Sequence, residues 1–353
     1  MNTGEARSTS SRASMRVTIV TDAWVPQVNG VVRTLMETTR ALQRLGHSVS
    51  VVTPASFRTL PCPSDPEIRL SLATAGMVGR AIEATGCDAL HVATEGPLGW
   101  AARRFALRRR YAFTTAYHTR FPEYLQPRLG VPLGWSYAVM RRFHAPAARV
   151  MAPTPSIVSD LESRRFGNVV LWSRGVDLQV FNPEPAGQNP RDFLEEKRPV
   201  FLYVGRVAVE KNVEAFLSLD LPGTKWVVGE GPQLADLKAR HGSSVHWAGV
   251  LAEHELARYY AAADVLVFPS RTDTFGLVLL EAMACGLPVA AFDVPGPRDV
   301  LAGSDAGAIG DDLRASCLRA LEIPRSRPRQ HALRFSWDAA ARQFASHLVG
   351  LRG

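Results

Sequence analysis

The chain has 353 residues, of which 46% are hydrophobic and 21% charged, a composition typical of a soluble globular protein. This length exceeds one ordinary hydrophobic core and predicts two domains. No apolar run approaches the roughly 20 residues that span a bilayer, and the N-terminus lacks the apolar stretch of a signal peptide. We therefore expect a cytoplasmic protein with a disordered extension over residues 1–14.

The net charge of +8 is concentrated in the first half of the chain. Residues 1–190 hold 22 arginines, no lysine and 13 acidic residues, whereas the remainder carries 19 basic and 20 acidic residues. Two interpretations stay open: a solvated helix face, or a surface that binds an anionic membrane or an acidic acceptor. Nucleic acid is not expected, because the chain contains no recognisable nucleic-acid-binding module. Much of the excess is local, in Arg103, Arg104, Arg108, Arg109, Arg110, Arg141 and Arg142.

The four cysteines are scattered along the chain, without a CxxC pair or a histidine at metal-ligand spacing. This pattern predicts neither a disulfide framework nor a structural zinc site, and we expect no metal and no cofactor.

From residue 15 onwards, short apolar runs alternate with loops and amphipathic helical segments. The sequence predicts a strand over 15–22, a helix over 31–47 and a second strand over 48–54. Further apolar runs follow at 89–94, 110–119, 149–154 and 168–177. This alternation is typical of a parallel sheet covered by helices, and predicts an N-terminal Rossmann-like domain over residues 15–185.

A polar, proline-rich stretch over residues 186–198 interrupts the alternation and predicts a linker. Apolar runs return at 200–206, 225–232, 245–250, 264–270 and 287–293, which predicts a second Rossmann-like domain over 199–334. An amphipathic helix within 335–353 can cross back to the N-terminal domain. Because ligands of open α/β sheets bind beyond the carboxyl ends of the strands, two facing domains would enclose a central cleft.

Residues 268–291, FPSRTDTFGLVLLEAMACGLPVAA, place a polar turn and a helix between two apolar runs. The first amides of that helix, at Phe275, Gly276 and Leu277, lack intrahelical partners and suit a diphosphate or a sugar hydroxyl. Glu281 lies one turn further along a helix of Leu, Val, Ala and Met, where a carboxylate is costly without partners. Vicinal ribose hydroxyls would supply two donors; the alternative is an exposed helix side.

Two glycine-containing strand ends supply a second group of candidates. In residues 203–212 a strand ends at Gly205, and Arg206 and Lys211 follow at a spacing that lets both cations reach one point. Such a pair suits a pyrophosphate whose negative charge grows as it leaves. In the run VGEGP, Gly229 would allow a base or a ribose to approach the backbone.

The N-terminal half offers two weaker candidates. Gly30 follows Asn29 between the first strand and the first helix, where a turn with exposed amides would contact phosphate. His118 stands just beyond a strand end, where its ring could bind a hydroxyl of the donor sugar. An ordinary turn and a satisfied core histidine are the respective alternatives.

These motifs, taken in order, resemble glycosyltransferase family 4 of the GT-B fold. They are PQVNGV, HTRFPEY, RGVD, VGRVAVEKN, VGEGP, YYAAADVLVFPS and DTFGLVLLEAMACGLPV. The resemblance covers nearly the whole chain from residue 15. It is strongest to the branch that contains GDP-mannose-dependent mannosyltransferases and the sulfoquinovosyl and glucosyl diacylglycerol synthases.

The resemblance implies roles for the candidates. The family's Glu, seven residues, Glu motif falls on Asp273 and Glu281, which implies that Asp273 contacts the donor sugar and Glu281 the ribose. The aspartate at 273 departs from the family pattern and has a shorter side chain. The resemblance further implies backbone contacts to the donor at 275–277, a diphosphate clamp at Arg206 and Lys211, and a phosphate loop at Gly30. His118 matches the histidine beside the transferred sugar.

The sequence therefore predicts a retaining, metal-independent transferase that moves a hexose from a nucleotide diphosphate sugar to an acceptor hydroxyl. UDP and GDP donors both stay open, as do lipid and saccharide acceptors. A lipid acceptor at the inner face of the membrane would explain the basic first half. A non-catalytic nucleotide-sugar-binding protein is the alternative of another class. A nicotinamide-dependent dehydrogenase is disfavoured, because no G-x-G-x-x-G follows a strand.

Overall fold

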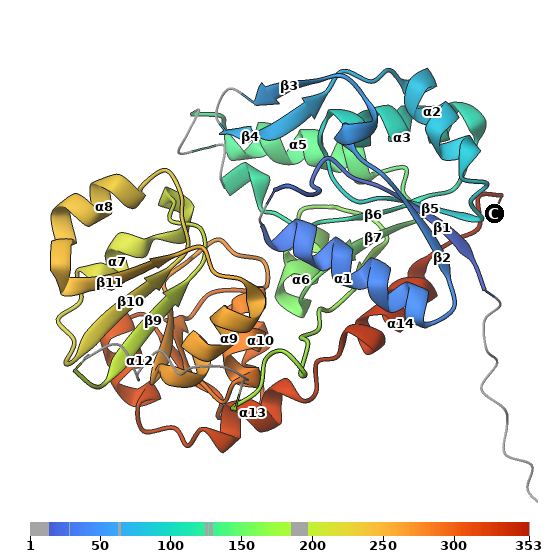
Figure 1. Cartoon of the computed structure of the whole chain (residues 1–353). Helices are drawn as coiled ribbons and strands as arrows, with labels where there is room; N and C mark the ends of the chain where they lie inside the picture. Colours follow the sequence, from blue (N-terminus) through green and yellow to red (C-terminus); the bar gives the residue numbers. More distant parts are fainter. Residues whose placement is uncertain are drawn as a thin grey trace, which may run out of the picture.

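The computed structural model describes residues 14–27, 29–62, 65–123, 126, 130–184 and 197–352. It contains two parallel six-stranded sheets, each covered by helices, in two halves that lie side by side (Figure 1). This arrangement confirms the predicted α/β fold with two Rossmann-like domains. The predicted extension, 1–14, and the predicted linker, 186–198, fall almost entirely outside the described residues and stay predictions.

The N-terminal sheet has the strand order β2-β1-β5-β6-β7-β8 and is parallel throughout. Its strands are β1 (Arg16–Val20), β2 (Ser48–Val52), β5 (Ala89–Val92), β6 (Thr114–Ala116), β7 (Arg149–Ala152) and β8 (Val169–Leu171). Its helices are α1 (Gly30–Arg44), α2 (Ala75–Ala84), α3 (Pro97–Arg109), α5 (Leu133–His144) and α6 (Pro155–Ser163). The short turn η1 (Pro54–Ser56) and an antiparallel hairpin of β3 (Thr59–Cys62) and β4 (Asp65–Ser71) lie at one side.

The C-terminal sheet has the order β11-β10-β9-β12-β13-β14 and is also parallel. Its strands are β9 (Val200–Val204), β10 (Thr224–Val228), β11 (Val245–Gly249), β12 (Val265–Phe268), β13 (Val289–Phe292) and β14 (Gly307–Gly310). Its helices are α7 (Val213–Leu217), α8 (Leu234–His241), α9 (Glu253–Ala262), α10 (Leu277–Ala284), α11 (Pro297–Val300), α12 (Leu313–Ala320) and α13 (Ser326–Ala332), with the short turns η3 (Val209–Lys211) and η4 (Gly242–Ser244).

The strands form where the sequence is apolar and β-branched. All five residues of β9 and all four of β12 are buried, as expected for strands of a parallel sheet covered on both faces. Because all strands of a sheet run the same way, their carboxyl ends meet at one edge, and the loops at those edges carry the predicted site residues.

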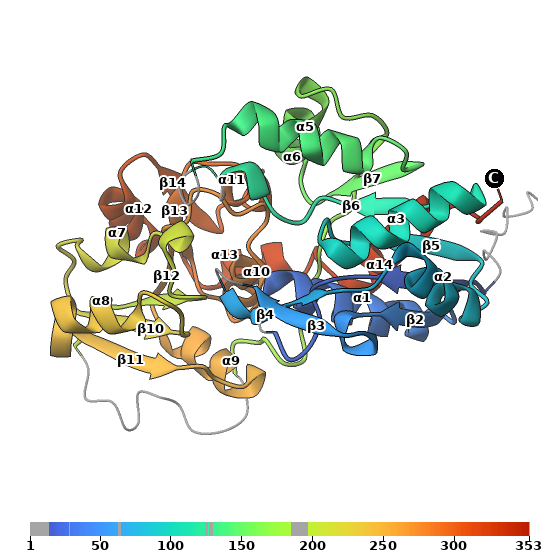
Figure 2. The same ribbon diagram turned by 90° about the horizontal axis from the view of Figure 1, so that it is seen from above.

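The last helix, α14 (Trp337–His347), belongs by packing to the N-terminal domain. Trp337 and Phe344 join the core cluster of Val17 and Leu35, and Arg44 on α1 forms an ion pair of 2.7 Å with Asp338. Figures 1 and 2 both show α14 beside α1, far from the helices that precede it in sequence. The chain therefore crosses between the domains twice among the described residues, and the two crossings meet at the bridge between Val176 and Ser336.

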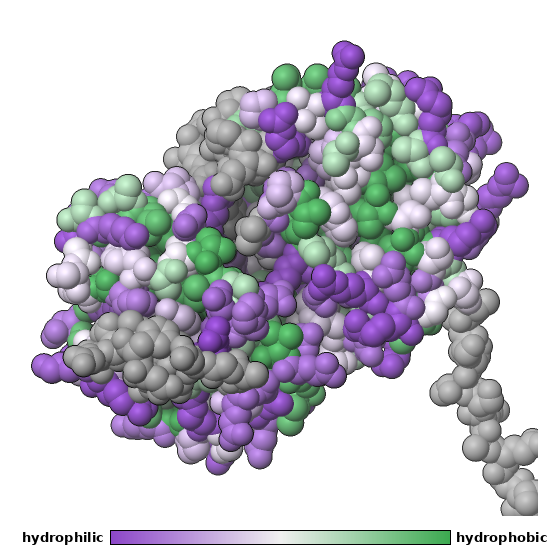
Figure 3. Space-filling model, in the orientation of Figure 1, coloured by the Kyte–Doolittle hydropathy of each residue, from purple (hydrophilic) through white to green (hydrophobic). Residues whose placement is uncertain are grey.

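The two domains are in direct contact across a cleft. The space-filling view shows the surface hollowed between them, with hydrophilic side chains along the hollow (Figure 3). Among the described helices, none is both long and apolar enough to cross a membrane.

Candidate active site

Several polar contacts between described residues join the domains at the cleft. The Thr274 hydroxyl donates to the carbonyl of His118 over 2.7 Å. At the amino end of α6, the amide and hydroxyl of Ser156 donate to Asp299 of the C-terminal domain over 3.1 and 2.7 Å. Arg33 on α1 reaches two glutamates of the C-terminal domain. The cleft is therefore closed in this structure, and the predicted residues His118 and Asp273 lie on either side of one interdomain hydrogen bond.

His118 follows β6 and packs edge-on against Trp172, with ring centroids 5.8 Å apart. Its Nδ1 lies 3.4 Å from Nη2 of Arg174, which can only donate, so the ring proton sits on Nε2. Burial and the Arg174 guanidinium hold the pKa of His118 well below its usual range, and the ring is neutral. Nε2 is buried and has no hydrogen-bond partner in the protein. It is an unsatisfied buried donor close to the interdomain contact.

Asp273 lies in the loop after β12 and contacts the predicted clamp. Its Oδ1 is 2.5 Å from Nζ of Lys211, which ends the short turn η3 after β9. Asn212 ties the same turn to the β12 loop through the carbonyl of Pro269, over 3.1 Å. The other carboxylate oxygen, Oδ2, is buried without a partner. The structure thus brings Lys211 and Asp273 together and leaves one acceptor unsatisfied.

Arg206 stands between β9 and η3, half-buried, on the loop that also carries Lys211. Its carbonyl accepts a hydrogen bond of 2.8 Å from the Tyr203 hydroxyl, which fixes the backbone at the strand end. Gly205 and Gly229 lie against each other: a Cβ on Gly229 would stand 2.0 Å from the carbonyl oxygen of Gly205. Gly229 also has a φ of +130°, a backbone conformation that favours glycine. A side chain at this position would therefore clash with Gly205 and strain the backbone as well.

The segment from 275 to 277, which leads into α10, has two side chains turned to apolar cores. Gly276 caps α10 with a φ of +85°, a conformation that favours glycine. The Phe275 ring is 6% exposed and belongs to the core of the C-terminal domain, while Leu277 packs against the cores of both domains. The predicted contribution of Phe275 and Leu277 is therefore confined to their amides in the first turn of α10.

The phosphate contact at Gly30 stays a prediction, and the two amides after Gly30 already have a partner. Oδ1 of Asn29 accepts from the amides of Val31 and Val32, each over 3.0 Å, and so caps α1. The asparagine that suggested an open turn in fact occupies the donors of the helix. Only the amide of Gly30 itself is left for the predicted phosphate contact.

Glu281 is buried at 3% exposure and is not on an exposed helix side. Its Oε1 lies 2.9 Å from Nη1 of Arg33, and its Oε2 accepts from the Tyr260 hydroxyl over 3.0 Å. Burial raises the pKa of Glu281, and the guanidinium of Arg33 opposes this effect. The prediction that this carboxylate needs partners is correct, but the structure supplies two of them from the protein.

Sequence reasoning missed Arg33 and Arg174. Arg33 was one residue of an amphipathic helix, and its partner Glu281 lies in the other domain, so no spacing rule connects them. The sequence did contain a signal for Arg174, because it places this cation two residues after the apolar run that ends at Trp172. It is 4% exposed, stacks over the Trp172 ring at 4.1 Å and donates to the Trp172 carbonyl over 2.6 Å. Burial lowers the pKa of Arg174 to about 9.

No metal site is apparent within the described ranges, because they hold no group of three or more His, Cys, Asp or Glu side chains placed to bind an ion.

Two family models match the chain, one on each domain. The model of Glycosyltransferase Family 4 matches residues 28–180, and the model of Glycosyl transferases group 1 matches residues 198–321. Together they include every candidate residue described above.

Several curated proteins are similar to the chain. The sulfoquinovosyl transferase SQD2 of Arabidopsis thaliana is 32% identical over 77% of this chain, which spans 58% of that longer protein. A GDP-mannose-dependent alpha-mannosyltransferase of Mycolicibacterium smegmatis is 31% identical over 84% of each chain. An alpha-monoglucosyldiacylglycerol synthase of Streptococcus pneumoniae is 28% identical over 87% of this chain and 78% of its own length.

Solved structures share the fold at low sequence identity. The sucrose-phosphate synthase of Thermosynechococcus elongatus superimposes with a TM-score of 0.74 at 22% identity, over 94% of this chain and 97% of that one. Anabaena HepE in complex with UDP-glucose gives a TM-score of 0.69 at 16% identity, over 94% and 98% of the two chains. With the motifs in order, both family models matched and this two-domain architecture, the chain belongs to glycosyltransferase family 4 and has the GT-B fold.

Proposed function

We propose that the protein transfers a hexose from a nucleotide diphosphate sugar to an acceptor hydroxyl, with retention of the anomeric configuration. One observation carries this proposal: a buried donor, Nε2 of His118, and a buried acceptor, Oδ2 of Asp273, are unsatisfied on opposite sides of the interdomain contact. A sugar hydroxyl both donates and accepts, so a hexose between the domains would satisfy both atoms.

In the proposed reaction the bond from C1 of the sugar to the diphosphate oxygen breaks as the bond from C1 to the acceptor oxygen forms. The acceptor proton moves to the departing diphosphate, so no protein nucleophile is needed. Arg206 and Lys211 would stabilise the charge that grows on the diphosphate, and the first amides of α10 would add partial positive charge. A neutral His118 would position the sugar without adding a cation beside C1.

The donor side of the proposal is a UDP- or GDP-hexose. Similar proteins include one named for GDP-mannose, and HepE, of similar fold, is seen in complex with UDP-glucose; both support a nucleotide diphosphate sugar. Glu281 is proposed to accept hydrogen bonds from the ribose hydroxyls.

Replacing Glu281 by glutamine is expected to raise the Kd of the free nucleotide diphosphate by roughly tenfold, because charge-assisted hydrogen bonds become neutral ones. Calorimetric titration with UDP and with GDP measures this change. Glu255→Gln is the matched control, because Glu255 caps its own helix by accepting from the Ala252 amide. Unchanged affinity in Glu281→Gln would remove Glu281 from the donor site.

For the acceptor we propose a membrane lipid, such as diacylglycerol or a lipid-linked glycan, presented at an anionic surface. The likeness to a monoglucosyldiacylglycerol synthase supports this choice. The second candidate is GDP-mannose-dependent transfer to a soluble or polysaccharide acceptor, which the likeness to the mannosyltransferases supports. A non-catalytic nucleotide-sugar-binding protein would bind donor without turnover in any acceptor assay.

The exposed faces of α3 and α5 form the proposed membrane surface. Arg103 does not belong to it, because it donates to the carbonyls of Arg142 and Phe143 and so ties α3 to the end of α5. Arg109 forms an ion pair with Glu83. The exposed residues that remain include an apolar and basic combination that suits an anionic interface: Trp135 at 75%, Val139 at 47%, Arg104, Arg108 and Arg142.

Changing Arg104, Arg108 and Arg142 together to serine is expected to weaken binding to phosphatidylglycerol vesicles by about two orders of magnitude. The reason is that each basic residue near the surface contributes about 1 kcal/mol, an attraction that salt screens. Co-sedimentation across a range of ionic strength measures the effect. A triple variant at Arg240, Arg298 and Arg327, exposed arginines of the C-terminal domain, makes the same change in net charge and should bind as the wild type does. A wild-type protein that ignores these vesicles even at low salt would favour a soluble acceptor.

A further inference from the structure

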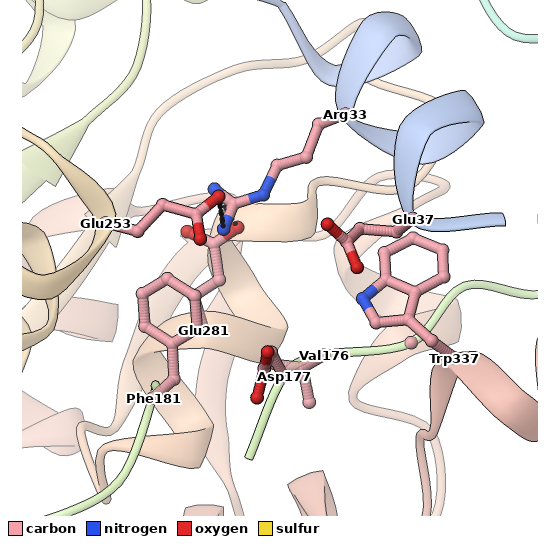
Figure 4. A pocket seen from close by; sticks show the side chains of 9 residues that line it. Arg33, Glu37, Val176, Asp177, Phe181, Glu253, Glu281 and Trp337 are labelled. Atoms are coloured by element: carbon pink, nitrogen blue, oxygen red, sulfur yellow. Dashed lines mark ion pairs between the residues drawn. The ribbon is translucent and has the colours of Figure 1, made fainter. Parts of the chain in front are cut away.

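Arg33 is the one side chain of the first domain that Figure 4 shows crossing to the glutamates of the second. It leaves α1 and ends between two carboxylates, with Nη1 at 2.9 Å from Oε1 of Glu281 and Nη2 at 3.0 Å from Oε1 of Glu253. Its guanidinium also lies over the Phe181 ring, 5.3 Å from the centroid. Two ion pairs and one cation–π contact therefore hold this side chain in the small cavity between the domains.

The charged groups that act on the pKa of Glu281 are the guanidinium of Arg33 and the carboxylate of Glu253. The hydroxyl of Tyr260 contacts Oε2, and Arg33 is the guanidinium that contacts Oε1. Burial is the main cause that raises the pKa of Glu281, Arg33 lowers it, and the nearby carboxylate of Glu253 raises it again. The charged and titratable groups around this carboxylate are Arg33 and Glu37 from α1, Asp177 from the segment after β8, Glu253 and Tyr260 from α9, and Cys285 just after α10, on which Arg325 and Arg329 act from the start and the middle of α13.

A carboxylate so deeply buried remains ionised only if a cation compensates it. Without one, the group takes up a proton rather than hold an isolated charge. Ionised, each oxygen has two acceptor positions. Arg33 uses one on Oε1 and Tyr260 one on Oε2, so that one position on each oxygen is left. Two vicinal hydroxyls, as on a ribose, would use these two positions together, whereas a protonated carboxyl group has lost part of this capacity.

We propose that Arg33 is a positioning residue through which the N-terminal domain completes the ribose subsite of the C-terminal domain, by holding Glu281 as an ionised acceptor. This rests on the proposed function, which assigns Glu281 to the ribose. Because the guanidinium comes from the opposite domain, the subsite is complete only when the cleft is closed. Binding of the nucleotide and closure of the cleft therefore favour each other.

The test is the pH dependence of nucleotide binding in Arg33→Gln. Without the guanidinium, Glu281 is protonated at mildly acidic pH and regains its charge as the pH rises. For Arg33→Gln we expect the Kd of UDP or GDP to be about tenfold above the wild-type value at about pH 6. This difference should shrink as the pH rises towards about 8.5. The wild type should show a smaller recovery over the same range, because Arg33 lowers the pKa of Glu281. Arg33→Lys should restore part of the affinity, because a cation returns without the two-pronged geometry.

Calorimetric titrations at several pH values measure these constants, and thermal unfolding establishes that each variant is folded. Arg44→Gln is the matched control, because Arg44 lies on the same helix and forms an exposed ion pair with Asp338 instead of contacting Glu281. The nucleotide affinity of this variant should equal that of the wild type. In the double variant Arg33→Gln with Glu281→Gln, the loss should not exceed that of Glu281→Gln alone, since both act on one carboxylate.

The outcomes separate this inference from the proposed function. If Glu281→Gln weakens nucleotide binding but Arg33→Gln leaves it unchanged and without pH dependence, the role of Arg33 is wrong and the ribose assignment stands. If Arg33→Gln binds the nucleotide more tightly, Arg33 blocks the subsite instead of completing it. If Glu281→Gln itself has no effect, the ribose assignment has failed, whatever Arg33 does.

Discussion

Replacing Lys211 by alanine is expected to lower kcat by about a hundredfold while the protein stays folded. Lys211 ends the short turn after β9, a quarter exposed, and its Nζ lies 2.5 Å from Asp273 at the cleft. A cation there would stabilise the negative charge on the departing diphosphate. This charge is larger in the transition state than in the bound donor, so the interaction lowers the barrier. Arg206→Ala should have an effect of the same order, because Arg206 stands on the same loop.

Steady-state turnover of the purified variants measures this loss, read as a change in transition-state free energy. Lys238→Ala is the matched control, since Lys238 lies on α8 in the same domain and contacts the Trp247 ring instead of the cleft. Near-wild-type kcat in either Lys211→Ala or Arg206→Ala would show that the diphosphate clamp is assigned to the wrong residues.

Replacing Asp273 by asparagine is expected to lower kcat/KM by about a hundredfold, with a smaller effect on the affinity for the free nucleotide diphosphate. The buried Oδ2 is proposed to accept from a hydroxyl of the transferred sugar, which the free nucleotide lacks. An amide in its place offers a weaker acceptor and also removes the charge that faces Lys211.

The comparison of two ligands decides this prediction. Calorimetry with the nucleotide diphosphate should give a Kd within a few fold of wild type, whereas turnover of the sugar nucleotide should collapse. If nucleotide affinity falls as much as kcat/KM does, Asp273 acts by holding Lys211 and does not contact the sugar. Asp273→Glu introduces the glutamate of the family pattern. This variant should retain most of the activity if the two residues differ only in the length of the side chain that carries the carboxylate.

Much of the fold could be predicted because the positions of the strands follow from the local sequence pattern. The runs at β9 and β12 are apolar and β-branched, and each is followed by a polar turn and a helix, so the parallel sheet follows from short-range pattern alone. The packing of α14 on α1 depends on side chains far apart in sequence, such as Phe344 and Leu35. Sequence patterning reveals that such a helix has an apolar face but not which surface covers it.

The convergence of the candidate residues at strand ends was predictable for the same reason. Lys211, Asp273 and the turn at Gly276 each follow a strand end, and strand ends of a parallel sheet converge. The partners of these residues were not predictable. Glu281 forms an ion pair with Arg33 of the other domain. Asn29 accepts a hydrogen bond from the amide of Val31, in the turn that was predicted to have exposed amides. Both facts depend on three-dimensional contacts for which one sequence holds no spacing rule.

The most direct test of the account is product analysis with a panel of sugar nucleotides and acceptors. UDP-glucose, UDP-galactose, UDP-glucuronate and GDP-mannose are each incubated with diacylglycerol in anionic vesicles and with soluble mannosides, and the products are examined by mass spectrometry and by NMR at the anomeric proton. We expect one donor and acceptor pair to yield acceptor enlarged by one sugar residue, with the anomeric configuration of the donor retained and with turnover lowered about a hundredfold by Lys211→Ala. A protein that binds the nucleotide yet transfers no sugar to any acceptor, or that yields the inverted anomer, would contradict it.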